Sequence, residues 1–125
     1  MQQGMPRERR RQRSEDACEA LALQLAQVRD KARLDALVLA SDEGLSIAYS
    51  GEEELCIELA ALAPFLPREA APRDAASDVD TLLVRPLSCG PLPLLLVSYC
   101  REQSPDGLAG WLDHASRGVL RILEP

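Results

Sequence analysis

The sequence predicts a mixed α/β (α+β) fold: a three-layer sandwich in which a central antiparallel sheet has two terminal helices on one face and a middle helix on the other. Three observations lead to this expectation. Apolar spacing runs in the order helix, strand, strand, helix, strand, strand, helix. Short glycine-containing turns join the strands within each pair, as in β-hairpins. One strand of each pair is apolar on both faces, so helices must cover both sides of the sheet.

Length and composition restrict the functions that need considering. The 125 residues are typical of one domain, and a hydrophobic share of 46% is enough for a core. Aromatic residues make up only 3%, which argues against a base-stacking surface. The single histidine, His114, excludes a multi-histidine metal site. We therefore expect no cofactor and no metal.

Charge divides the chain into two parts. Residues 1–13 hold five arginines against Glu8, a net charge of +4, whereas residues 14–125 hold 9 basic and 19 acidic groups, a net charge of −10. We expect 1–13 to be a disordered basic arm and 14–125 to be the folded domain. An acidic body disfavours nucleic acid as a partner. Attachment of the arm to an anionic membrane or to nucleic acid stays open as an alternative.

The first predicted helix spans residues 15–33, with Ser14 as its cap. Its apolar stripe has spacings of three and four and consists of Cys18, Leu21, Leu25, Val28 and Ala32. Strands are predicted at 36–40 and 45–49, where the second alternates and should lie nearer an edge. Gly44 supplies the positive φ that the turn between them needs.

The middle helix is predicted at 52–66 and is apolar nearly all round. Glutamates 52–54 suit its first turn, and only Glu58 interrupts the apolar positions that follow. A helix that is apolar on every side is buried on more than one side. In so small a protein we expect the second cover to come from another chain. The predicted dimer interface consists of Leu55, Leu59, Leu62 and Phe65.

The second half repeats the pattern after a polar connection at 67–80. Strands are predicted at 79–87 and 92–99, with Pro93 at the start of the latter. Ser104, Pro105 and Asp106 form a helix start, and apolar residues keep helical spacing to about residue 123.

Signals for catalysis are weak throughout. The segment Asp42-Glu43-Gly44 has the wrong charge for a phosphate loop. A lone helical histidine such as His114 is usually a surface or core residue, and Trp111 fits a core or interface position. The cysteines 18, 56, 89 and 100 form no C-x-x-C pair and are expected to be small buried hydrophobes. We predict no catalytic, cofactor-binding or metal-binding residues.

The segment Leu34 to Ala48, LDALVLASDEGLSIA, together with the 92–99 strand and the last helix, resembles the roadblock (dynein light-chain) family. The resemblance covers residues 15–123 and is greatest to bacterial polarity proteins of the MglB and MglC type. It implies a roadblock/longin-like fold, pairing as homo- or heterodimers through the middle helices, and service as a platform for Ras-like small GTPases. Family members usually have an extra strand where this chain has 67–78, a region rich in proline, alanine and charge, and its presence here stays open.

The resemblance implies a noncatalytic homodimeric adaptor or regulator in a small-GTPase cell polarity and motility system. The alternative is a GTPase-activating partner of a small Ras-like GTPase. Expected partners are a second copy of the chain, other roadblock proteins or polarity regulators, and a Ras-like GTPase. The apolar runs are far shorter than the ~20 residues of a membrane span, so no stable membrane insertion is expected. The absence of an apolar leader segment predicts a cytoplasmic protein.

Overall fold

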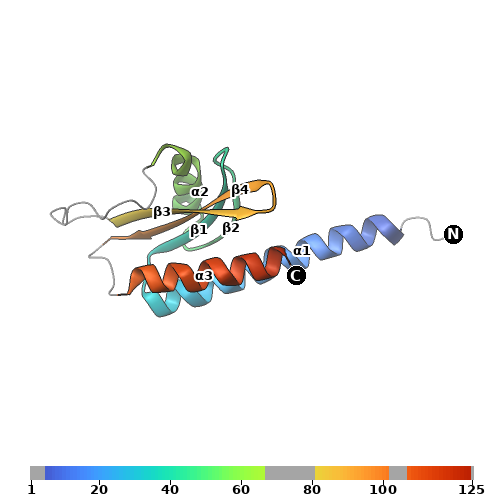
Figure 1. Ribbon diagram of the computed structural model, residues 1–125, viewed down its shortest axis with the longest axis horizontal. Helices are drawn as coiled ribbons and strands as arrows, with labels where there is room; N and C mark the ends of the chain where they lie inside the picture. The colour runs from blue at the N-terminus through green and yellow to red at the C-terminus, as the bar shows by residue number, and fades with distance from the viewer. Residues whose placement is uncertain (1–4, 67–80, 102–106, 125) are drawn as a thin grey trace.

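The computed structural model describes residues 5–66, 81–101 and 107–124, which form a four-stranded antiparallel sheet with helices on both faces (Figure 1). The strand order is β2-β1-β4-β3. In chain order the elements are α1 (Met5–Ala32), β1 (Ala36–Ser41), β2 (Ser46–Ser50), α2 (Glu53–Leu62), a 3-10 turn η1 (Ala63–Phe65), β3 (Thr81–Cys89), β4 (Leu92–Cys100) and α3 (Leu108–Leu123). The predicted three-layer sandwich is confirmed.

Side chains of the two central strands alternate between two separate cores. Leu37 and Leu39 of β1 pack with α1 and α3, whereas Val38 between them packs with α2. In β4, Leu96 and Val97 divide in the same way. This alternation follows from the two-residue period of a strand, and it explains why these strands lack a polar face.

The first hairpin forms where predicted, and β2 is an edge strand. The Ser41 hydroxyl oxygen accepts hydrogen bonds from the backbone N–H groups of Glu43 and Leu45, both at 3.2 Å. Gly44 has φ +91°, which confirms its predicted role in the turn. A Cβ atom on Gly44 would lie 3.4 Å from the Cα of Ala61, so this turn packs directly against α2.

Both prolines of the second hairpin occupy tolerated positions. Pro86 lies in β3, which among the described strands has a neighbour on one side only. Pro93 precedes Leu94, the first residue of β4 that pairs with β1. Pro93 therefore lies outside the part of β4 that has neighbours on both sides, in agreement with its predicted place at the start of the strand.

The first helix begins ten residues earlier than predicted. The helix starts at Met5 rather than at residue 15, so residues 5–13 are helical and the expectation of an unstructured segment there is wrong. Arginine, glutamine and glutamate are good helix formers, and Pro6 falls in the first turn, where proline is tolerated. Figure 1 shows this part of α1 extending past the end of α3. The division into a basic arm and a domain beginning at 14 stays a prediction.

Two other boundaries also differ from expectation. The α-helical part of α2 ends at Leu62, because Pro64 cannot donate to a continuing helix, and the chain finishes with η1. The structure starts α3 after Gly107, which has φ +76°. The predicted cap at 104–106 and the question of an extra strand in 67–78 both lie outside the described residues.

Candidate functional site

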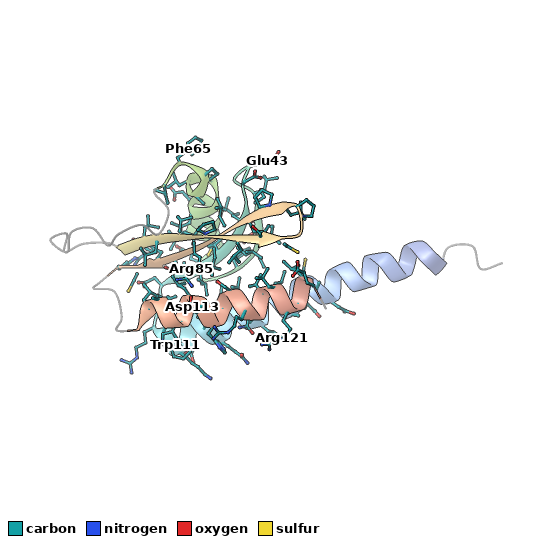
Figure 2. The ribbon with its side chains drawn as sticks, viewed as in Figure 1. Glu43, Phe65, Arg85, Trp111, Asp113 and Arg121 are labelled. Carbon is teal, nitrogen blue, oxygen red and sulfur yellow. The ribbon has the colours of Figure 1, made fainter. Side chains whose placement is uncertain are left out.

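The outward face of α2 and η1 presents large apolar side chains to solvent. Phe65 is 84% exposed, Ile57 is 50% exposed and Leu62 is 44% exposed. Figure 2 shows Phe65 at the outer side of the α2 layer, away from the sheet. The opposite face of the same helix is buried against β1 and β4 through Cys56, Leu59, Ala60 and Ala63. The helix therefore contributes to the core with one face and leaves a second apolar face uncovered.

The four residues predicted for the dimer interface do not share one face. Leu59 is only 3% exposed and belongs to the core beneath α2, so it is not available to a partner. Leu55 is half-buried and packs against the same core. Leu62 and Phe65 are the two that point to solvent. Burial of Leu59 follows from its phase, because positions 56, 59, 60 and 63 recur at helical spacing and face the sheet.

Ile57 belongs to the exposed face, although the interface predicted from the sequence did not include it. Its spacing places it on the same face as Phe65, because residues 57, 61 and 65 recur every four positions. Ala61 is exposed as well. We call the set Ile57, Ala61, Leu62 and Phe65 the α2 patch.

Acidic residues border the α2 patch. Glu54 and Glu58 are exposed and lie on the same outward stripe of the helix as Phe65. Glu58 follows Glu54 by four residues, and Phe65 follows Glu58 by seven. Glu43 projects from the β1–β2 turn on this same side of the sheet (Figure 2). Glu53 instead faces β2. Burial raises the pKa of Tyr49, and so does the Glu53 carboxylate, which accepts a hydrogen bond from the Tyr49 hydroxyl.

A second surface, between β3 and α3, is a shallow open groove of about 430 Å³. Arg85 from β3 forms an ion pair with Asp113 from α3 across it. The Ser116 hydroxyl donates to the Leu112 carbonyl at 2.7 Å, so it is engaged within its own helix. These polar groups join β3 to α3, and their arrangement offers no paired nucleophile and base.

The remaining candidates have structural positions. Trp111 is half-buried against the core under α1 and α3, and its ring meets that of His114 edge-on at 6.1 Å between centroids. Cys56 and Cys100 are buried as expected, whereas Cys18 is exposed. Burial of Cys18 was predicted because it continues the α1 stripe, but the first described residue of that stripe to be buried is Leu21. Burial raises the pKa of the Cys56 thiol, and that thiol lies 3.7 Å from the Ser50 carbonyl oxygen to which it donates.

Among the described residues, no group of three or more His, Cys, Asp or Glu side chains is placed to hold a metal ion. Likewise, none of the helices in this part of the chain has the length and apolarity to cross a membrane.

Comparison with known proteins places the fold. No family model matches the sequence, and no curated protein matches it either. Among solved structures, Myxococcus xanthus MglB superimposes with a TM-score of 0.67 over 85% of this chain and 89% of that chain. The chain has the fold of MglB. Sequence identity to MglB is 15%, so the likeness lies in the arrangement of helices and strands. The roadblock/longin-like fold implied by the sequence resemblance is thereby confirmed.

Proposed function

We propose that this chain is a noncatalytic roadblock-type adaptor or regulator that acts by protein–protein contact and pairs with a second copy through the α2 patch. The observation that carries the proposal is the exposure of Phe65, Ile57 and Leu62 on a helix whose other face is already buried. Burying a wholly exposed side chain of this kind contributes about 1.5–3 kcal/mol, so Phe65 gains most and the half-exposed Ile57 and Leu62 gain about half as much each. A symmetric dimer buries each of them twice, so the patch is a strong source of association energy.

The likeness to MglB and the sequence resemblance support the wider setting. The chain shares the MglB fold over most of its length, and the roadblock resemblance implies pairing through middle helices and service to Ras-like GTPases. We propose a cytoplasmic role in a small-GTPase polarity system, with other roadblock proteins or polarity regulators as further partners. The alternative is that the chain accelerates GTP hydrolysis by its Ras-like partner.

Sedimentation at increasing concentration tests the pairing. We expect the wild-type chain to pass from monomer to dimer and Phe65→Asp to remain monomeric, because a charge in a desolvated contact opposes association. Leu23→Asp is the matched control, since Leu23 is 66% exposed on α1, on the other side of the sheet. Leu59 is unsuitable for this test because it is buried within the chain. Equal dimerisation of the wild type and Phe65→Asp would overturn the proposed interface.

GTP turnover by a Ras-like GTPase encoded beside this chain separates the two functions. Binding without faster hydrolysis supports the adaptor, whereas hydrolysis that is faster in proportion to added chain supports the activating partner. Absence of both binding and acceleration removes that GTPase as a partner.

A further inference from the structure

The described stretch of chain that carries and flanks the α2 patch has charge of a single sign. Residues 34–66 contain no lysine or arginine, and their acidic residues are Asp35, Asp42, Glu43, Glu52, Glu53, Glu54 and Glu58. All of these except Asp35 are exposed. This stretch supplies β1, β2, α2 and the turn that packs on α2. Within residues 34–66, α2 and the β1–β2 hairpin beside it therefore offer acidic groups and no basic ones.

Two of these carboxylates lie inside any contact that the patch makes. Glu54 and Glu58 share the outward stripe of α2 with Ala61 and Phe65, and Glu58 is adjacent in sequence to the exposed Ile57. A partner that covers Phe65 and Ile57 must also lie against Glu58. An unpaired charge that is removed from water opposes association, whereas an opposite charge on the partner compensates it.

A second copy of this chain meets that requirement poorly. When two identical patches face each other, each copy brings its own Glu54 and Glu58 and no basic residue from α2, β1 or β2. Juxtaposed like charges discriminate against a partner, and such repulsion is a common source of specificity. A partner with the same apolar area bordered by lysine or arginine gains both burial and ion pairs.

From this charge pattern we infer that the α2 patch prefers a different protein, one that presents an apolar surface bordered by basic residues, over a second copy of this chain. The inference rests on the proposed function, because it takes the α2 patch as the pairing surface. It adds that the homodimer is the weaker of two alternative pairings. Glu54 and Glu58 are the specificity-determining residues.

The chain itself provides the probe for such a partner. In Glu54→Lys/Glu58→Lys, which we call the lysine copy, the α2 patch is kept and its border becomes basic. We mix an isotope-labelled lysine copy with an equal amount of wild type and count the dimers by native mass spectrometry. We expect mixed dimers to exceed the half of all dimers that random pairing gives. Exposed charge pairs change an association constant roughly two- to fivefold each, so two or more give about tenfold preference at low salt. High salt should reduce it, because exposed charges are screened.

Two controls isolate the effect of charge at the patch. Glu54→Gln/Glu58→Gln removes the charges without reversing them and should strengthen the homodimer. Glu19→Lys places a lysine at an exposed position on α1 and should leave pairing unchanged. Circular dichroism of each variant establishes that the fold is kept.

Each outcome separates the inference from the proposed function. Preferential mixed dimers that weaken with salt support the inference, and mixed dimers from a wild-type chain that forms no homodimer support it while overturning the homodimer. A statistical mixture at every salt concentration overturns the inference and leaves pairing through α2 intact. Absence of any dimer in either chain or in the mixture overturns both.

Discussion

Leu59 and Phe65 belong to the same short segment, and the structure assigns them opposite roles. Leu59 is 3% exposed and packs with Val38, Leu95 and Val97 of the two central strands. Leu59→Ala removes most of an apolar side chain at a place where the cavity walls are hydrogen-bonded strands that cannot easily collapse. Substitutions of this kind cost 2–5 kcal/mol, and we expect about 3 kcal/mol here. For a chain of this length that corresponds to a fall in Tm of roughly 10 °C.

Phe65→Ala should behave differently, although it removes a larger side chain. Phe65 is 84% exposed, so the folded monomer loses little packing, and its unfolding free energy should change by about 0.5 kcal/mol or less. Urea denaturation followed by circular dichroism measures both variants, at protein concentrations low enough that association does not contribute. A Leu59→Ala cost below about 1 kcal/mol, or equal costs for the two variants, would refute the assigned orientation of α2.

Three further predictions concern single residues of the scaffold. Ser98 is 1% exposed and its hydroxyl has no hydrogen-bond partner among the described residues, so Ser98→Ala should raise the unfolding free energy by about 1 kcal/mol in the same urea assay. Gly51 has φ +134° and a Cβ there would lie 2.9 Å from the Asp35 carbonyl oxygen, so Gly51→Ala should lower Tm in a thermal melt by an amount equivalent to about 2 kcal/mol; an unchanged Tm would show that this approach is not close. Burial raises the pKa of the Cys56 thiol above its ordinary value of 9.0, so the folded state holds this proton more tightly than the unfolded state. Its contribution to stability is therefore complete below pH 9.0 and is lost as pH rises through the folded-state pKa, and Cys56→Ala should flatten a plot of unfolding free energy against pH in that range.

The sequence predicted the sheet better than it predicted the orientation of the middle helix. Alternating apolar residues and glycine turns are local signals, and they located all four strands within about two residues. A helix that is apolar nearly all round gives no signal of which side faces the sheet, so Leu59 was placed in the interface and Ile57 was left out of it. Only the packing of Cys56 and Leu59 against the strands settles that phase.

The prediction of where α1 starts was wrong for a different reason. A dense run of arginines is typical of disordered arms, but the same residues have high helix propensity and follow Pro6. Continuation of an existing helix needs no new nucleus, so propensity decided the outcome. The acidic border of the α2 patch was visible as a charge pattern, but its place beside Phe65 required the fold.

Disulfide cross-linking at the α2 patch tests the central claim most directly. Ala61 is exposed midway along the patch, so Ala61→Cys in a Cys18→Ser background brings two thiols together if α2 helices pair. Ala109→Cys, exposed on α3, is the matched control. We predict a covalent dimer from Ala61→Cys under mild oxidation and none above background from Ala109→Cys. Equal cross-linking at the two positions, or cross-linking at Ala109→Cys alone, would contradict pairing through α2.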